Sequence, residues 1–315
     1  GTMNAGQSRG RAGKDVTVAI CTWNRAAFLD RTLASFHRLC IPEGVDWELI
    51  VVDNNCTDTT PHVVQRHQEF LPIHCVSEKQ QGHSASRNAA VETARGELLI
   101  WTDDDVLVDS NWLTAYWDAF QYQSEISFWG GVIRPDFESP PPSWVESNWE
   151  ICSRLFAIRE SNAMLEPMTA THLPFGANFA IRTPIQRQQL YDVEFGRSGQ
   201  SMRGFDEIDV LRRLMEKGHR GGWCPEAELQ HCIPRERVSL DYVRKYFQGQ
   251  GETLAYRGET GLPPEELRRQ LKRRRRNYFL NRWLKPSNIW LKDLIDLSRL
   301  EGQLTYLQTH SERLS

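Results

Sequence analysis

A regular alternation of strand-like and helix-like segments in the first third of the chain restricts its fold most strongly. Four apolar runs rich in β-branched residues are predicted as strands, at residues 16–21, 49–52, 73–76 and 98–101. Three intervening segments have apolar residues at helical spacing, at residues 26–39, 57–70 and 84–95. Strands that alternate with helices over short connections form parallel sheets covered by helices. We therefore expect an α/β protein whose ligands bind at the carboxyl ends of the strands.

The pattern becomes less regular after residue 105. Helices are predicted over residues 111–121, 207–217 and 240–256, and strands over residues 128–133 and 175–181. Residues 138–144 contain three consecutive prolines and are predicted to form an extended loop. From residue 263 onward the chain is expected to be helical. The sequence contains no internal repeat.

The cysteine pattern indicates reduced thiols. The chain has seven cysteines, an odd number, and none lies in a Cys-x-x-Cys pair. No run approaches the roughly 20 apolar residues that would cross a bilayer. The first 15 residues are small, polar and basic, and they lack the apolar core of a signal peptide. These features predict a cytoplasmic location, with residues 1–15 as a disordered segment that includes a tag remnant.

An acidic triplet, Asp103, Asp104 and Asp105, follows the apolar strand at 98–101. Adjacent carboxylates repel one another unless a cation or hydrogen-bond donors lie nearby. Carboxylates at a strand end suit Mg²⁺ or Mn²⁺, which bind through one or two carboxylates together with substrate phosphates. A solvated acidic turn that caps the next helix is the alternative.

Polar residues also follow the first two predicted strands. Residues 22–25 read Thr-Trp-Asn-Arg, and residues 53–58 read Asp-Asn-Asn-Cys-Thr-Asp. Neither turn contains the glycine pattern of a dinucleotide-binding protein or of a P-loop, which argues against a dehydrogenase and against a P-loop NTPase. The two turns are expected to line one nucleotide crevice, although 53–58 also has the composition of an Asx-rich helix cap.

The order of these motifs resembles glycosyltransferase family 2, whose members have the GT-A fold. The resemblance rests on residues 18–25, 51–58, 82–88, 103–105, 176–178, 206–214 and 231–237. It implies a Rossmann-like, mostly parallel sheet flanked by helices, here with a helical C-terminal extension. On this basis residues 16–258 form the GT-A domain, with a nucleotide-binding half at 16–105 and an acceptor-binding half at 106–258. Residues 259–315 form the basic helical extension.

The resemblance also implies roles for single residues. It places Asp105, Asp103 and His231 at a divalent metal, and Gly176, Ala177 and Asn178 at the acceptor or the transferred sugar. Contacts with the donor nucleotide are implied for Thr22, Asn24, Arg25, Asp53, Arg87, Asp103, Asp104 and Arg237. Arg235 is a second candidate for the leaving diphosphate.

The candidate base lies at the start of the predicted helix at 207–217. Family members usually carry Glu-Asp at this place, with the Asp as base, whereas this chain has Asp206 followed by Glu207. The register favours Glu207, and Asp206 can alternatively cap the helix. A carboxylate there would remove the acceptor proton during attack.

The resemblance implies an inverting transferase that uses a nucleotide-sugar donor, with UDP-sugar favoured, and a glycan or lipid-linked acceptor. Residues 135–174 are expected to shape the acceptor site, with Trp144, Trp149 and Phe156 as platforms or as core residues. Two alternatives stay open: a nucleotidyltransferase that makes nucleotide sugars, and an inactive nucleotide-sugar binding protein. The glycine-rich activating loop of the former is absent at residues 22–25.

Charge is distributed unevenly along the chain. Residues 265–285 contain nine Lys or Arg and two Glu, which gives this segment a charge of +7 within a chain of net charge −3. Aromatic and aliphatic residues follow the basic run. Residues 265–290 are therefore a candidate for peripheral contact with an anionic membrane at its inner face, or a solvated helix packed on the body. Nucleic-acid binding is not expected, because the rest of the chain is acidic and has no recognition module.

Overall fold

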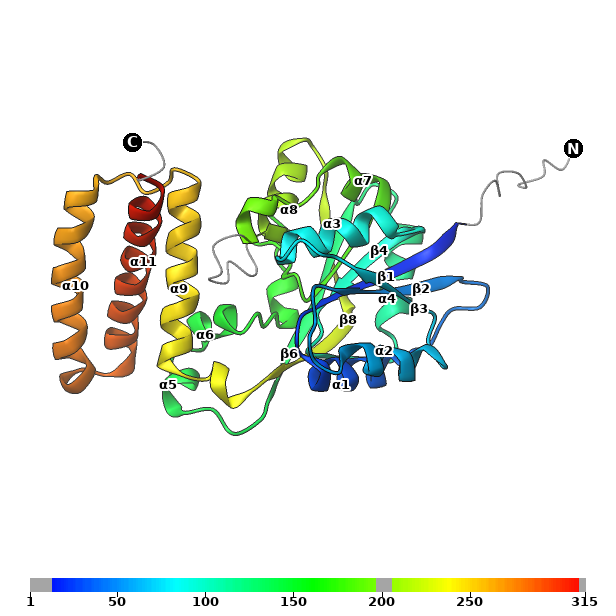
Figure 1. Ribbon diagram of the computed structural model, residues 1–315, viewed down its shortest axis with the longest axis horizontal. Helices are drawn as coiled ribbons and strands as arrows, with labels where there is room; N and C mark the ends of the chain where they lie inside the picture. Colours follow the sequence, from blue (N-terminus) through cyan, green and yellow to red (C-terminus); the bar gives the residue numbers. More distant parts are fainter. Residues whose placement is uncertain (1–12, 197–205, 312–315) are drawn as a thin grey trace, which may run out of the picture.

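The computed structural model describes residues 13–196 and 206–311, and it contains a single eight-stranded sheet within them (Figure 1). The strand order is β3-β2-β1-β4-β7-β6-β8-β5. Helices lie on both faces of the sheet, and three long helices form a separate layer at the C-terminal end (Figure 1). The predicted tag-bearing segment at 1–15 lies outside the described residues up to residue 12, and Lys14 and Asp15 already belong to β1.

The first half of the sheet is parallel, as the sequence predicts. Its strands are β1 (Lys14–Thr22), β2 (Trp47–Asp53), β3 (Ile73–Ser77) and β4 (Gly96–Thr102). The connecting helices are α1 (Ala26–Phe36), α2 (Thr60–Gln68) and α3 (His83–Thr93). Because these strands are parallel, their carboxyl ends and the polar turns after them meet at one edge of the sheet.

The second half makes the sheet mixed. Its strands are β5 (Val106–Val108), β6 (Phe128–Phe137), β7 (Asn178–Arg182) and β8 (Gly221–Ile233). Strand β7 lies antiparallel between β4 and β6, β8 runs parallel to β6, and β5 pairs antiparallel with β8. The sequence analysis missed β5 and β8. In β8 the polar Glu226, Glu228 and Gln230 alternate with the buried Ala227 and Leu229, and this two-residue period was overlooked because β8 contains no continuous apolar run. The three-residue strand β5 is too short to show periodicity.

Shorter helices cover the second half. They are α4 (Trp112–Tyr122), α5 (Ser143–Glu146), α6 (Trp149–Leu155), α7 (Thr183–Gln188) and α8 (Asp206–Glu216), with 3₁₀ turns at Ser161–Met164, Val193–Gly196 and Arg235–Arg237. The proline-rich segment 138–144 is extended until α5 begins at Ser143. Helix α8 begins at Asp206 and Glu207, the two candidates for the catalytic base, and presents Val210, Leu211 and Leu214 to the sheet.

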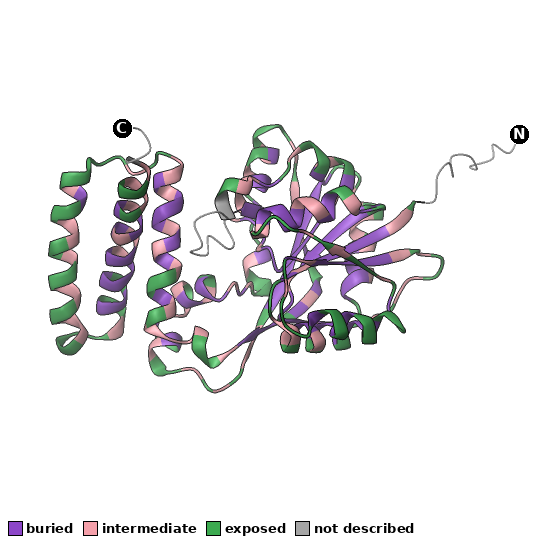
Figure 2. Ribbon diagram, in the orientation of Figure 1, coloured by how far each residue is buried: buried purple, intermediate pink, exposed green. Residues whose placement is uncertain are grey.

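The core consists of two clusters, one on each face of the sheet. Val18 and Ile20 of β1 belong to the larger cluster, whereas Ala19 between them belongs to the smaller one. This alternation is the expected result of a strand covered on both sides. Figure 2 shows the buried strands between helices whose outer faces are exposed.

Three helices follow the sheet: α9 (Leu240–Tyr256), α10 (Pro264–Leu284) and α11 (Ser287–Ser311). Helix α9 lies against the body, α11 packs on α9, and α10 is outermost (Figure 1). Val243 and Phe247 of α9 belong to the main core cluster, so α9 joins the bundle to the sheet domain. The close α9–α11 approach uses glycine, because a Cβ at Gly251 or Gly302 would overlap backbone atoms of the facing helix. Within the described residues, no helix has the length and apolar character that a membrane span requires.

Candidate active site

A pocket of about 620 Å³ opens at the carboxyl ends of β1 and β4. Its walls include Thr22 at the end of β1, the acidic triplet after β4, and the first residues of α8. Tyr242 and Tyr246 of α9 line it from the bundle side. The pocket therefore lies where a parallel sheet places its ligands, and it is bounded by both halves of the predicted GT-A domain.

Arg25 holds two carboxylates of the acidic triplet together. Its guanidinium donates to Oδ1 of Asp104 over 2.8 Å and to Oδ2 of Asp105 over 3.0 Å. The hydroxyl of Thr22 donates to Oδ2 of Asp104 over 2.9 Å. Both carboxylates are buried, and Asp103 lines the pocket beside them. The arginine fork thus compensates the mutual repulsion of the buried carboxylates.

His231 approaches the same carboxylate from β8. Its Nε2 lies 3.2 Å from Oδ2 of Asp105, and its Nδ1 lies 2.7 Å from the carbonyl oxygen of Phe156. Arg237 places Nη1 2.9 Å from His231 Nε2. A guanidinium can only donate and an ionised carboxylate can only accept, so Nε2 faces one partner that requires its lone pair and one that requires its proton. Nε2 therefore stands between Arg237 and Asp105 at the wall of the pocket.

Asp105 is strongly biased toward its ionised form. Burial by itself would raise the pKa of its carboxyl, but the basic neighbours outweigh burial and hold the pKa well below its usual range. Its second oxygen, Oδ1, is buried and has no hydrogen-bond partner among the described residues. An ionised, buried oxygen without a partner is an available ligand for a cation.

These residues fit a divalent metal in part. Asp105 and His231 offer an oxygen and a nitrogen ligand side by side, which suits Mn²⁺ and is compatible with Mg²⁺. No group of three or more His, Cys, Asp or Glu side chains in residues 13–196 and 206–311 is arranged to hold a metal. The remaining positions would therefore come from diphosphate oxygens and water, and the role of Asp103 at the metal stays a prediction.

A second cluster of charges is formed around Arg87 of α3. Its Nη1 lies 3.3 Å from Oε2 of Glu207 and 3.6 Å from Oδ1 of Asp206. The guanidinium also stacks over the rings of Tyr191 and Trp101, at 5.0 and 5.6 Å. All three charged side chains are buried. Arg87 thus pairs with the candidate base residues, and its predicted contact with the nucleotide stays a prediction.

The two carboxylates differ in their contacts and in their protonation. Glu207 accepts a hydrogen bond from the backbone N–H of Gly176 over 3.0 Å, whereas Asp206 faces His83 and Ser84 at 3.3 and 3.5 Å. Burial and the charge of Asp206 raise the pKa of Glu207 well above its ordinary value. Burial opposes the ionisation of Asp206, but Arg87 and His83 outweigh it and lower the pKa of Asp206. The two pKa values are thus shifted in opposite directions, so Glu207 is the member of the pair that keeps its proton to the higher pH.

Not every predicted site residue lines the pocket. Asn24 accepts a hydrogen bond from the backbone N–H of Thr57 over 2.7 Å, and Asp53 accepts one from the N–H of Cys56 over 2.8 Å. Both therefore stabilise the turns that follow β1 and β2, as the Asx-turn interpretation expects. Arg235 is exposed, whereas Arg237 lies in the site.

Of the predicted acceptor residues, Gly176 and Ala177 line the pocket, but Asn178 does not. The Asn178 side chain is fully buried and makes four hydrogen bonds, two with side chains of α4 and two with backbone carbonyls of β6 and β8. Its carbonyl accepts from Trp112 and Tyr116, and its amide donates to two backbone carbonyls. Of the predicted aromatic platforms, Phe156 lines the pocket, whereas Trp144 and Trp149 pack against the core.

The sequence analysis missed several residues of the pocket wall. Asn54 accepts from the backbone N–H of Gly82 over 2.9 Å and so links the turn after β2 to the start of α3. His83 reaches Asp206, and Tyr242 and Tyr246 enter from α9. Asn54 and His83 lie within the recognised segments 51–58 and 82–88 but were given no role of their own, and nothing in the sequence of α9 indicated that it returns to the pocket.

The arrangement of sheet and helices is the GT-A fold, which this protein shares with a solved mannosyltransferase and with TarS. The family model described as Glycosyl transferase family 2 matches residues 17–188, which is more than half of the chain, and this protein belongs to that family.

Known proteins support this assignment. The succinoglycan biosynthesis protein ExoM of Rhizobium meliloti (strain 1021) is 24% identical over 250 residues, covering 76% of this chain and 73% of that protein. The mannosyltransferase PcManGT from Pyrobaculum calidifontis, solved with GDP-Man and Mn²⁺, has a TM-score of 0.57 at 18% identity, covering 96% of this chain and 76% of that one. S. aureus TarS 1–349 with UDP-GlcNAc has a TM-score of 0.54 at 14% identity, covering 95% and 92%. The two structures establish the shared fold.

Proposed function

We propose that this transferase moves a sugar from a nucleoside-diphosphate donor to a hydroxyl of a glycan or lipid-linked acceptor, with inversion at the anomeric carbon. The reaction belongs to polysaccharide or glycoconjugate synthesis, in keeping with the relative from succinoglycan biosynthesis. The observation that carries the proposal is that one pocket joins the Asp105–His231–Arg237 cluster to the Asp206–Glu207 pair. The first cluster suits a leaving diphosphate, and the second suits proton removal.

We assign the donor nucleotide to the crevice at the ends of β1 and β2. Thr22 and Asn54 line this part of the pocket, and Asn24 and Asp53 shape the turns behind it. UDP is the proposed nucleotide, in line with the UDP-GlcNAc that TarS binds, whereas PcManGT binds GDP-Man. UDP and GDP carry the same diphosphate, so recognition of the nucleobase determines which nucleotide binds.

Asp105 and His231 would hold Mn²⁺ or Mg²⁺ against the donor diphosphate. When bound, such an ion acts as a Lewis acid that stabilises the negative charge of the departing diphosphate. Arg237 lies 3.6 Å from Asp105 and supplies a permanent positive charge to the same group. Arg25 already neutralises Asp104 and Asp105 and so keeps the acidic triplet compact before the donor arrives.

Glu207 is the proposed base. Its raised pKa makes the Glu207 carboxylate a stronger proton acceptor than an ordinary glutamate. Once Glu207 is ionised, its carboxylate takes the proton of the acceptor hydroxyl as that oxygen attacks the anomeric carbon. The hydrogen bond from Gly176 and the ion pair with Arg87 fix the orientation of this carboxylate. Asp206 keeps the charge on Arg87 compensated throughout.

The acceptor is proposed to enter from the bundle side of the pocket. Helices α6 and α9 contribute Arg154, Tyr242, Lys245 and Tyr246 to this wall. Two aromatic rings and two cations provide a surface for stacking on a sugar face and for hydrogen bonds to its hydroxyl groups.

Calorimetric titration with UDP, GDP and dTDP, each with and without Mn²⁺, tests the donor site. We expect binding of one nucleotide to depend on Mn²⁺ and to be lost in Asp105→Ala. The variant Asp109→Ala, which changes a carboxylate in the turn after β5, serves as the matched control. Folded protein that binds none of the three nucleotides would contradict the proposal and favour an inactive relative.

The stereochemistry is tested separately. Proton NMR of the first product formed from an α-linked donor is expected to show a β-linkage. An α-linked product would overturn the single-displacement mechanism while leaving the donor assignment intact.

A further inference from the structure

Helix α10 has one face on the bundle and one face in solvent. Leu267 is buried against α11, and Leu271 and Tyr278 are partly buried on the same side. The opposite side carries Lys272, Arg276, Phe279 and Trp283. Their spacing of four, three and four residues places them in one stripe along the helix. We call the solvent-facing side of α10, with the following turn up to Ile289, the outer face.

The outer face is strongly basic over its first half. Six of its Lys and Arg side chains are exposed: Arg268, Arg269, Lys272, Arg273, Arg275 and Arg276. Arg269 pairs with Glu266, and Arg275 pairs with Glu301. The other four form no ion pair with any residue in the described part of the chain. This positive charge is therefore available to an anionic partner.

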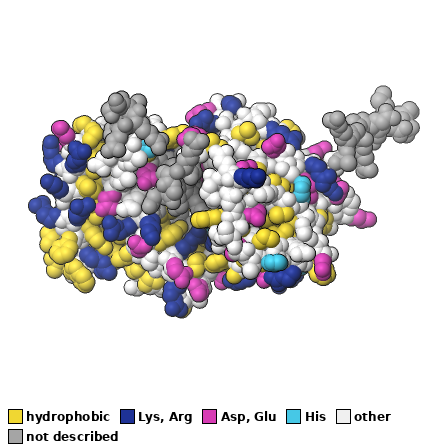
Figure 3. Space-filling view, in the orientation of Figure 1, with side chains coloured by type: hydrophobic (Ala, Val, Ile, Leu, Met, Phe, Trp, Pro, Cys, Tyr) yellow, Lys and Arg dark blue, Asp and Glu magenta, His cyan; other side chains and the backbone are white. Residues whose placement is uncertain are grey.

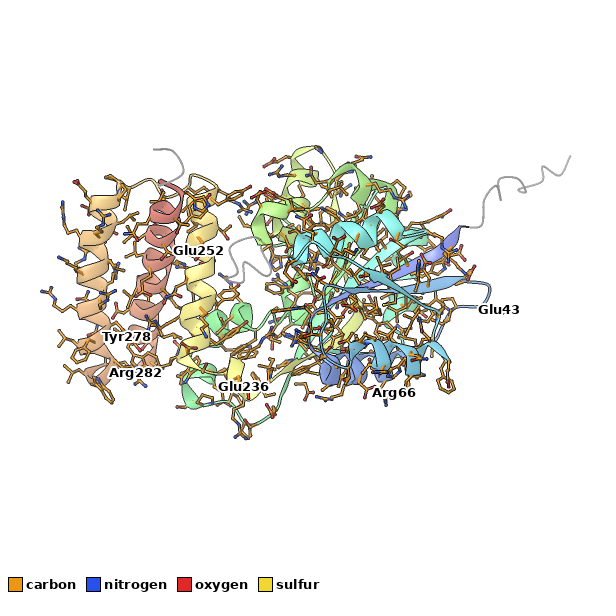
Figure 4. All side chains as sticks on the ribbon, viewed as in Figure 1. Glu43, Arg66, Glu236, Glu252, Tyr278 and Arg282 are labelled. Carbon is orange, nitrogen blue, oxygen red and sulfur yellow. The ribbon has the colours of Figure 1, made fainter. Side chains whose placement is uncertain are left out.

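The outer face is apolar at its other end. Phe279, Trp283 and Leu284 are exposed by 70%, 77% and 75%, and Leu280 and Ile289 are also exposed. Figure 3 shows basic side chains along the outer edge of α10 and hydrophobic ones gathered at its lower end. Tyr278 and Arg282 lie at this same end in Figure 4, and the Arg282 guanidinium stacks 4.4 Å from the ring of Trp290. The stacking of Arg282 on Trp290 therefore joins the apolar end of α10 to α11.

Basic and aromatic groups in this order match the surface of an anionic bilayer. Lys and Arg attract anionic headgroups, while Trp, Phe and Leu enter the boundary between headgroups and acyl chains. A second copy of the chain that packed its own outer face on this one would set the basic half against another basic half or against an apolar end, and in neither arrangement would it supply an anionic partner. A nucleic acid would engage the charges but leave Leu280, Leu284 and Ile289 without a partner.

We propose that the outer face of α10 docks this protein on an anionic lipid membrane, with the side chains from Phe279 to Leu284 entering the interface. The apolar end of α10 and the start of α9 lie at the same end of the bundle (Figure 1). Tyr242 and Lys245 near that start line the pocket. Docking through the apolar end of α10 thereby places the membrane at the end of the bundle where α9 enters the pocket wall. The inference rests on the surface alone and does not depend on the transfer chemistry.

Co-sedimentation of the full chain with vesicles tests the proposal. One set of vesicles is pure phosphatidylcholine, and the other is an equal mixture of phosphatidylcholine and phosphatidylserine. We expect binding to the anionic vesicles, weakening with added salt, and little binding to the neutral ones. The double variant Lys272→Gln/Arg276→Gln should bind about thirtyfold more weakly, from about 1 kcal/mol for each charge. Phe279→Ala/Trp283→Ala should also lose binding.

The matched control is Arg66→Gln/Phe70→Ala, which removes a cation and an exposed aromatic ring at the end of α2. Arg66 lies on the opposite side of the molecule (Figure 4). This variant should bind like the wild type. Equal binding to both kinds of vesicle, or an equal loss in the control, would overturn the proposal. So would light scattering that shows a dimer which Phe279→Ala/Trp283→Ala converts to a monomer, or single-stranded RNA that binds more tightly than the anionic vesicles.

Discussion

The backbone N–H of Gly176 donates a hydrogen bond to Oε1 of Glu207 over 3.0 Å, and the glycine Cα faces both Glu207 and Arg87. A Cβ at this position would lie 2.5 Å from Nη2 of Arg87 and 3.0 Å from Cδ of Glu207. The absence of a side chain at Gly176 therefore allows the buried carboxylate and guanidinium to meet beneath the pocket.

Gly176→Ala is accordingly expected to impair catalysis more than folding. The methyl group displaces Arg87 or Glu207, and a small misplacement of a reacting group costs about a hundredfold in rate. The stability loss should stay within the roughly 1–3 kcal/mol of an overpacked site. The checks are kcat and the urea midpoint. Gly222→Ala is the control, because its Cβ would lie 3.3 Å from the Ile126 side chain and 3.5 Å from that of Trp129, neither of which lines the pocket. Unchanged kcat in Gly176→Ala would contradict the role given to this contact.

The variants Glu207→Gln and Asp206→Asn should distinguish the roles of the two carboxylates. Loss of a general base lowers kcat by about 10²–10⁴-fold, so Glu207→Gln should show a loss in this range while its affinity for the donor nucleotide is retained. Asp206→Asn leaves Arg87 undercompensated, and its main effect should be on stability. Steady-state kinetics and calorimetric nucleotide binding measure the two effects. A larger kcat loss in Asp206→Asn would reassign the base to Asp206.

The stability of the protein should depend on pH through the same pair. The folded-state pKa of Glu207 is raised, so the folded protein retains a proton that the unfolded chain releases above its ordinary carboxyl pKa. Stability is then fully present below that value and declines as the pH rises toward the folded pKa, by up to about 1.4 kcal/mol per pH unit. Glu207→Gln should flatten this decline in urea unfolding measured at several pH values. A variant curve parallel to the wild type would contradict the pKa shift.

The pH dependence of stability that Asp206 contributes has the opposite sign to that of Glu207. Its folded-state pKa is lowered, so the stability that it contributes is present above its ordinary carboxyl pKa and is lost as the pH falls. Asp206→Asn should therefore reduce the acid sensitivity of folding, which the same measurements report below the ordinary carboxyl range.

Arg25→Gln should make folding depend on metal. The substitution removes the cation that bridges Asp104 and Asp105, and removal of one partner from a buried pair costs about 3–5 kcal/mol. Arg237, at 3.6 Å, is left as the guanidinium beside Asp105. Mn²⁺ can replace the lost charge, so added Mn²⁺ should raise the melting temperature of the variant more than that of the wild type. Scanning calorimetry with and without Mn²⁺ provides the measurement. An equal shift in the two proteins would show that Mn²⁺ does not take the place of the Arg25 charge.

Asn178→Ala is expected to act on stability. The change leaves two buried donors and two backbone carbonyls without their partner, a cost of about 3–5 kcal/mol. Chemical unfolding measures this loss, and acceptor KM measured at low temperature reports on the site. Unchanged stability together with a raised KM would instead support the acceptor role that the family resemblance implies for Asn178.

The sequence by itself determined the parts that depend on local pattern. The strands β1 to β4 and their helices follow from short-range periodicity, and the glycosyltransferase assignment followed from motif order, which the family match confirms. Helix α9 was placed at its observed bounds for the same reason. Local pattern also located the acidic triplet and the Asp206–Glu207 pair.

Only the tertiary structure decided which of these groups meet. Asp105 and His231 are 126 residues apart, and their contact depends on β5 pairing antiparallel with β8, a strand that the sequence analysis missed. The opposite pKa shifts of Asp206 and Glu207 likewise arise from burial beside Arg87, which belongs to a different helix. Periodicity reports which face of an element is apolar, but the partner of a charged side chain is set by long-range packing that leaves no regular trace in the sequence.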